Sequence, residues 1–212
     1  TSADVILFNI DSKSDMNSHN DRDAIVKVFL KVFNEKLGYC AENAYIADLE
    51  RNLDAKGKLE EFKRTFEDVA MQPWDEARHD FMFVQDDIVE VLDTMGFMSE
   101  EAARNWCERA SNMDYSITIE NFTKLVNDYI TSKGPNHHVV FMVDEMGQYV
   151  GDNLQLLLNL QTVTEDLGSR CKGKAWVIVT SQQDINEVTK GKVKADQFSK
   201  IQGRFDTRLS LS

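Results

Sequence analysis

The sequence contains few of the residues that mark several common classes of protein. Only two prolines occur among 212 residues, which argues against a fold built mainly from turns or linkers. Cys40, Cys107 and Cys171 are far apart and form no CxxC pair, so we expect neither a disulfide framework nor a zinc site, and a reducing, cytoplasmic compartment. No apolar run approaches the roughly 20 residues of a membrane-spanning helix, so a soluble protein without membrane contact is expected.

Positive charge is scarce and lies near one end of the chain. The net charge is −12, of which residues 1–168 carry −17 and residues 169–212 carry +5. Acidity over most of the chain argues against general binding of nucleic acid, because binding its phosphates requires a basic face. The short basic end suits the phosphates of a nucleotide or an acidic partner chain.

Short apolar runs typical of buried parallel strands occur at residues 4–10, 139–143 and 175–179. Helical spacing predicts a helix over 152–167, with Gly168 as its C-cap, and another over 194–202 before an alternating strand at 207–211. This order of strands and helices is typical of a doubly wound α/β fold with a parallel sheet.

The first two predicted strands are separated by far more residues than one crossover connection needs. Apolar spacing predicts several helices in between, one of them running from Pro73 to Leu92. We therefore expect residues 1–19 to begin an α/β core, residues 20–136 to form an inserted helical subdomain and residues 137–212 to complete the core. The acid-rich stretch 75–93 is interpreted as a solvated face, with partner docking as the alternative.

Asp144 and Glu145 directly follow the apolar run 139–143 and are the strongest candidates for chemistry. Nucleotide-bound magnesium keeps several waters and takes few protein carboxylates, so Asp144 at a strand end suits it. Glu145 would then orient and deprotonate the water that attacks the γ-phosphate. This is the Walker B arrangement of P-loop ATPases, and the alternative is an acidic strand end that only faces solvent.

Thr180, Ser181 and Gln182 form a polar tip on the next predicted strand. Ligands of open α/β sheets bind beyond the carboxyl ends of the strands, so this tip and Asp144 should converge on one crevice. We expect Thr180 to help bind the nucleotide, and Ser181 or Gln182 to sense the γ-phosphate or position the water. The alternative is that these three residues merely begin a loop.

Gln202-Gly203-Arg204-Phe205 and the following Thr207-Arg208 resemble the arginine-finger segment of initiator-type AAA+ ATPases. A planar guanidinium donates two hydrogen bonds to a phosphate, which suits an arginine that reaches a nucleotide. Arg204 is therefore a candidate finger that acts on a neighbouring subunit, and Arg208 a candidate nucleotide contact. A surface salt bridge is the alternative for both.

Residues 168–175 nearly match the phosphate-binding P-loop motif GxxxxGK[ST], but Ala175 stands where the motif has Ser or Thr. A P-loop follows a strand and opens a helix, whereas this segment follows a predicted helix and precedes a strand. We interpret it as an ordinary connecting loop, and we expect the true P-loop just upstream of Thr1, in a larger protein. His137 and His138 have no ligand partners nearby in the sequence and are interpreted as structural.

Residues 137–212 resemble the large P-loop ATPase of the BREX phage-defence systems, the BrxC/PglY family. The likeness lies in FMVDEMGQYVGDN (141–153), LNLQT (158–162), TEDLG (164–168), KAWVIVTSQ (174–182) and FSKIQGRF (198–205). It implies a bacterial ATPase that binds ATP and Mg²⁺, forms homo-oligomers and works with other defence proteins, including a DNA methyltransferase. Any contact with DNA would then be indirect.

The sequence thus predicts part of an AAA+-like ATPase module with an all-helical insertion. Without a P-loop, residues 1–212 alone should not hydrolyse ATP. A rival hypothesis is a scaffold that organises partner proteins without hydrolysis, and an upstream GxxxxGK[ST] motif would favour the enzyme over it. Sequence-specific DNA binding by the insertion is disfavoured by its acidity.

Overall fold

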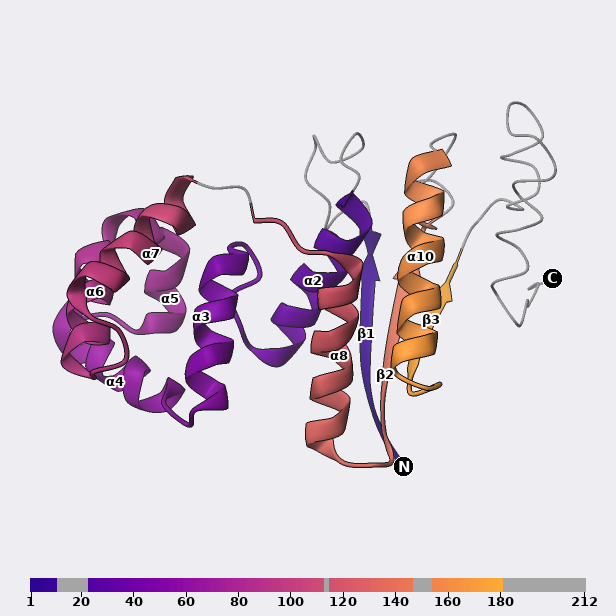
Figure 1. The fold of residues 1–212 in the computed structure, drawn as a ribbon, viewed down its shortest axis with the longest axis horizontal. Helices are drawn as coiled ribbons and strands as arrows, with labels where there is room; N and C mark the ends of the chain where they lie inside the picture. The colour runs from indigo at the N-terminus through magenta and orange to yellow at the C-terminus, as the bar shows by residue number, and fades with distance from the viewer. Residues whose placement is uncertain (11–22, 113–114, 147–153, 181–212) are drawn as a thin grey trace. The chain divides into compact units, whose positions relative to one another are not determined.

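A computed structural model describes residues 1–10, 23–112, 115–146 and 154–180 (Figure 1). Its sheet has three parallel strands, β1 (Ser2–Asn9), β2 (His137–Asp144) and β3 (Ala175–Val179), in the order β1-β2-β3. The predicted α/β class with a parallel sheet is therefore confirmed. The helix predicted over 194–202 and the strand predicted over 207–211 lie outside the described residues.

The described residues form two compact units, one made of those within 1–33 and 116–180 and the other of those within 34–115. We call them the sheet unit and the helical unit. The helix α2 (Ala24–Leu37) as far as Phe33 and the helix α8 (Ile119–Lys133) belong to the sheet unit. Both lie in the range 20–136 that we had assigned to the insertion, so the compact helical unit is shorter than that range.

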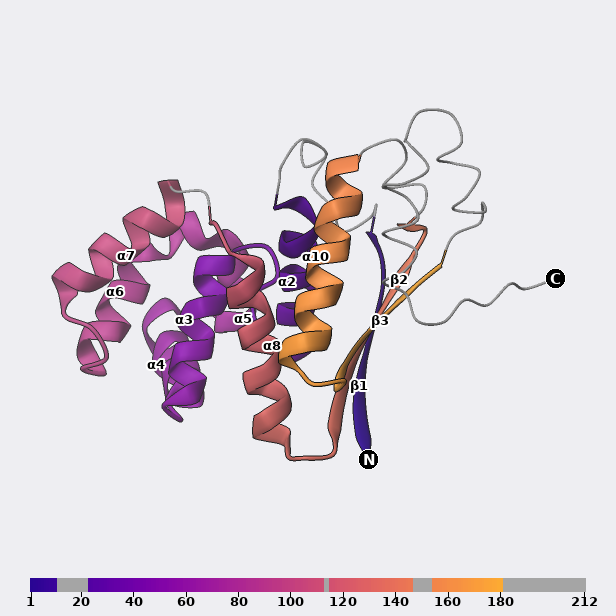
Figure 2. The same ribbon diagram turned by 45° about the vertical axis from the view of Figure 1, so that its right-hand side comes forward.

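One face of the sheet is covered by α2, α8 and α10 (Leu154–Arg170), which all lie on the same side of the strands (Figure 2). Alternate strand residues point toward these helices. Phe29 of α2 packs edge-on against Phe8 of β1, with 5.5 Å between ring centroids, and Phe122 of α8 lies 6.1 Å from Phe141 of β2. The core of the sheet unit therefore lies between this face and the three helices.

The opposite face of the sheet is apolar and largely exposed. It carries Val5, Leu7, Trp176 and Ile178, whose exposed fractions range from 45% to 70%, together with the partly buried Val140 and Met142. We call these six residues the bare face, because no helix of the described ranges covers them. Within those ranges the outer edges of β1 and β3 also lack a partner strand.

The helical unit consists of α3 (Ala44–Ala55), α4 (Leu59–Ala70), α5 (Trp74–Ala77), the 3₁₀ helix η2 (Arg78–Phe83), α6 (Gln85–Thr94) and α7 (Glu100–Asn112). Their apolar stripes bury one shared core. Trp74 lies at its centre, with its ring centroid 4.9 Å from that of Phe62 and 5.0 Å from that of Phe66.

The single helix predicted from Pro73 to Leu92 is wrong, because α5, η2 and α6 replace it. Pro73 does precede a helix, as predicted, but the backbone of Asp80 leaves the helical region at φ −104° and ψ 34°. Phe81, Val84 and Ile88 are buried, so the core contacts keep the spacing of a continuous helix. The break is at Asp80, which is exposed, so the spacing of buried apolar residues does not reveal it. An aspartate side chain also disfavours the interior of a helix.

The prediction that Gly168 ends its helix is also wrong, because α10 continues to Arg170. The last turn is held by buried Leu167 and Cys171, four residues apart on one helix face. The positive φ angles that end the helix fall at Lys172 and Gly173 instead. Neither α10 nor any other helix in the described ranges has the length and apolar character needed to cross a membrane.

Candidate functional site

The three strands end in polar residues that lie side by side at the carboxyl edge of the sheet. The strand register pairs Asn9 of β1 with Asp144 of β2. On the other side of β2, the amide of Thr180 donates a hydrogen bond to the carbonyl of Val143, at 2.9 Å, so Thr180 lies beside Asp144. These three positions continue the rows of the bare face, since side chains alternate along each strand.

Asp144 is held in place by two donors at this edge. The Thr180 hydroxyl donates to Oδ1 of Asp144, and the backbone amide of Glu145 donates to the same oxygen at 3.1 Å. Asp144 and Thr180 are both exposed, so their side chains are accessible to a ligand. The carboxylate is thus oriented by the protein before any ligand arrives.

Glu145 has a left-handed backbone conformation, with φ at 57°. A residue with a side chain pays of order 1–3 kcal/mol for such a conformation, and residues held this way concentrate at functional sites. The turn directs the Glu145 carboxylate to β1, where the Asn9 side-chain amide donates to Oε2 at 2.5 Å. The next residue, Met146, is buried and anchors the turn. Asn9, Asp144, Glu145 and Thr180 therefore form one connected site, which we call the edge site.

The edge site unites three residues that the sequence analysis singled out, namely Asp144, Glu145 and Thr180. Asn9 was missed, although it ends an apolar strand in the same way as Asp144 and Thr180 do. The available signal was a polar residue directly after the apolar residues 5–8, although the predicted strand 4–10 extended beyond it. Ser181, Gln182, Arg204 and Arg208 lie outside the described residues, so their roles stay predictions.

The near-match to a P-loop lies at the other end of the sheet. Residues 168–170 end α10, residues 171–174 form a turn and β3 begins at Ala175. The carbonyl of Lys174 accepts a hydrogen bond from the amide of Val139, near the amino end of β2. The interpretation of this segment as a connecting loop is confirmed.

His137 belongs to a polar cluster at the same amino end. Its Nε2 lies 3.1 Å from Asp4 Oδ2, its Nδ1 lies 2.9 Å from the Ser2 hydroxyl, and the Tyr129 hydroxyl donates to Asp4 at 2.5 Å. Burial and the hydrogen bond to Asp4 raise the pKa of Tyr129 above its ordinary value, so it remains a donor. The cluster joins β1, β2 and α8, which agrees with the structural role expected for His137.

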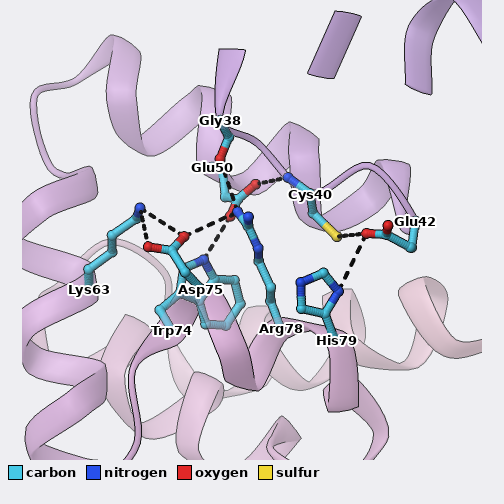
Figure 3. Close-up of polar contacts among 9 residues, drawn as sticks. All are labelled: Gly38, Cys40, Glu42, Glu50, Lys63, Trp74, Asp75, Arg78 and His79. Carbon is cyan, nitrogen blue, oxygen red and sulfur yellow. Dashed lines mark hydrogen bonds and ion pairs between the residues drawn. The ribbon is translucent and has the colours of Figure 1, made fainter. Parts of the chain in front are cut away.

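A second polar cluster lies inside the helical unit and centres on Glu50 of α3 (Figure 3). The Glu50 carboxylate is buried and accepts hydrogen bonds from the Cys40 amide at 2.5 Å, the Trp74 indole at 2.7 Å and Nη1 of Arg78 at 2.7 Å. Burial lowers the pKa of Arg78, but the hydrogen bond and charge of Glu50 and the charge of Asp75 outweigh it and raise the pKa overall. The cluster joins α3, α5, η2 and the loop after α2.

The cysteines are not arranged as nucleophiles. All three are buried, burial raises the pKa of the Cys40 thiol, and it raises those of Cys107 and Cys171 to about 11. Thiols with a raised pKa stay protonated near neutral pH and react slowly. Cys40 lies beside Glu42, which also contacts His79 at 3.5 Å (Figure 3). The Glu50 cluster is therefore structural.

No protein-family model matches the sequence, and no solved structure matches it significantly. Within the described ranges, no three His, Cys, Asp or Glu side chains come together as a metal site.

Proposed function

We propose that this chain is the Walker B part of an AAA+-like ATPase module and that it hydrolyses ATP once a P-loop completes the site. The observation that carries the proposal is the pairing of Asp144 with Glu145 at the tip of the central strand, between Asn9 and Thr180. Hydrolysis of ATP by the full-length protein tests it. An intact upstream P-loop with measurable turnover supports the enzyme, whereas no turnover favours the scaffold hypothesis.

In this proposal each residue of the edge site has a separate task. Asp144 would bind Mg²⁺ largely through water, which suits a single carboxylate because nucleotide-bound magnesium needs few protein ligands. The bound ion would neutralise charge on the phosphates. Thr180 orients Asp144 through its hydroxyl. Glu145 would accept a proton from the attacking water, and its carboxylate is held at this edge by the Asn9 amide.

Among the described residues, no strand pairs with the outer edge of β3 and no helix covers the bare face, which supports a P-loop on the β3 side. The strands β1, β2 and β3 follow each other across the sheet in one direction, with their connecting helices on one face. A strand that precedes β1 in the chain and pairs with the free edge of β3 must connect back to β1 in the opposite direction. Crossover connections between parallel strands are right-handed, so a connection that crosses the sheet in the opposite direction places its helix on the opposite face. That face is the bare face.

That arrangement would bring the phosphate loop to the edge site. A P-loop lies between its strand and its helix, at the carboxyl end of a parallel strand. Beside β3, this end is adjacent to Thr180 and Asp144, which face the same side as the bare face. The same strand–helix unit would thus cover both the bare face and the polar residues at the carboxyl ends of its strands.

Residues 1–212 alone should show no measurable ATPase activity and no tight binding of Mg²⁺-ATP. The backbone amides and the lysine that hold the phosphates are missing from them. Fluorescence titration with a labelled ATP analogue, compared with the full-length protein, is the measurement. Tight magnesium-dependent binding by residues 1–212 would mean that the phosphate site lies elsewhere.

Replacing Asn9 with alanine in the full-length protein should raise the basal rate of ATP hydrolysis by up to about tenfold. The Asn9 amide occupies Oε2 of Glu145, and water must compete with it for the carboxylate. A hydrogen bond to a charged group contributes roughly 1.5–3 kcal/mol. If about half of this free energy lowers the barrier to hydrolysis, the rate rises by up to about tenfold. Steady-state turnover measures the effect, with Asn9→Asp as a variant that lacks the amide donor. A rate reduced to that of a Glu145 variant would show instead that Asn9 positions the base.

The wider role follows from the resemblance and stays a proposal. The full-length protein would act in bacterial phage defence, in the cytoplasm, as a homo-oligomer with partners that include a DNA methyltransferase. In such an oligomer Arg204 would reach the nucleotide of a neighbouring subunit, and Arg208 would contact the nucleotide phosphates. Loss of phage protection in a Glu145→Gln strain would link the edge site to that role.

A further inference from the structure

Two large apolar side chains of the helical unit face solvent at the end of η2. Phe83 is 88% exposed and Met82 is 63% exposed, whereas their neighbours Phe81 and Val84 are buried in the core. Full burial of a Phe or Met side chain stabilises a folded protein by about 1.5–3 kcal/mol. Met82 and Phe83 do not contribute this free energy to folding, because they remain exposed. Adjacent exposed apolar residues of this kind mark interaction surfaces more often than isolated ones do.

Met82 also lines an open groove of about 270 Å³ between α6 and α7. Val89 and Cys107 are the buried residues among those that line it, and a hydrogen bond of 3.0 Å between Gln85 and Ser111 joins its two walls. The volume suits one or two aliphatic side chains. We call this groove, together with Phe83, which follows Met82 in the chain, the η2 groove.

The helical unit that carries the η2 groove is acidic. Residues 34–115 contain 20 acidic and 9 basic residues, a net charge of −11 out of −12 for the chain. Arg104, the basic residue that lines the groove, already pairs with Asp86 and Glu100. Glu108 lines the groove, and Asp80 precedes Met82 by two residues in the chain. Both are exposed, and among the described residues no cation pairs with either carboxylate.

We propose that the η2 groove binds a segment of a partner protein that carries both apolar and basic side chains. Apolar side chains would enter the groove and pack on Phe83, while lysines or arginines would meet the carboxylates of Asp80 and Glu108. A nucleic acid does not fit, because its phosphates would face these carboxylates. A second copy docked by the same surface does not fit either, since it would bring two units of net charge −11 together. The proposal is independent of ATP hydrolysis.

The test uses residues 1–212 with ¹³C-labelled methionine methyl groups and a short amphipathic peptide of leucine and lysine. The chain has eight methionines, and Met71 provides an internal control, since it is 85% exposed in the same unit but does not line the groove. We expect the peptide to shift the Met82 methyl resonance and leave that of Met71 unchanged. Raising the salt concentration should weaken binding, because the groove and peptide attract each other by charge.

Phe83→Ser should weaken peptide binding roughly tenfold or more, the factor that corresponds to losing one buried aromatic contact. Met71→Ser is the matched control and should leave affinity unchanged, and both variants should keep the circular dichroism of the parent. The proposal is overturned if no binding occurs, if a leucine–glutamate peptide binds as well, or if Phe83→Ser has no effect. Self-association that Phe83→Ser abolishes, seen by sedimentation equilibrium, would show that a second copy is the occupant and would also overturn it.

Discussion

Glu145→Gln in the full-length protein should reduce ATP turnover by on the order of 10²–10⁴ and leave ATP binding intact. The substitution removes the group that accepts a proton from water but keeps its size. The Gln side-chain oxygen can still accept the hydrogen bond from the Asn9 amide, so the turn after β2 should keep its shape. Single-turnover hydrolysis and nucleotide titration, carried out on the same preparation, separate the chemical step from binding.

Two further variants make this result specific. Asp144→Asn should weaken the magnesium-dependent binding of ATP, because it removes a negative charge from the residue that the Thr180 hydroxyl orients. Glu101→Gln, on the exposed surface of α7 in the helical unit, changes the same kind of side chain and should leave turnover unchanged. Unchanged hydrolysis in Glu145→Gln would exclude this residue as the general base and would return the edge site to the scaffold hypothesis.

The sheet and most of the edge site could be predicted from the sequence because their residues follow simple rules. Apolar runs of strand length mark β2 and β3, and the position directly after a buried parallel strand places Asp144 and Thr180 at one edge. Asn9 obeys the same rule and was overlooked, because no carboxylate or motif drew attention to it. Its contact with Glu145 spans 136 residues and depends on the register of β1 with β2.

Other features could not be predicted from spacing at all. The break at Asp80 leaves the apolar stripe of the helical unit intact, so periodicity describes one helix and three segments equally well. The extent of the helical unit depends on where α2 and α8 pack, and both have the apolar stripe of any helix with one buried face. Buried polar contacts such as those of Glu50 join three segments and leave no periodic trace.

The Glu50 cluster should contribute much of the stability of the helical unit. Glu50 is 1% exposed, and its carboxylate is the acceptor for a backbone amide, an indole and a guanidinium at once. Removing one partner of a buried ion pair typically costs 3–5 kcal/mol, because the remaining charge is left without compensation. Arg78 would keep only the Gly38 carbonyl, at 3.0 Å, and the exposed Asp75, at 3.3 Å.

Glu50→Ala should therefore lower the free energy of unfolding of the helical unit by about 3–5 kcal/mol. The measurement is urea unfolding in a Trp176→Phe background, in which Trp74 and Trp106 are the remaining tryptophans and both report on this unit. Glu60→Ala, on the exposed face of α4, is the matched control and should change stability by less than about 0.5 kcal/mol. The double variant Glu50→Leu/Arg78→Met should be more stable than Glu50→Ala, since replacing both charges by apolar groups leaves neither uncompensated. A loss below about 1 kcal/mol in Glu50→Ala, the size of an ordinary hydrogen bond, would mean that water reaches Arg78 and that the cluster is not a buried ion pair in solution.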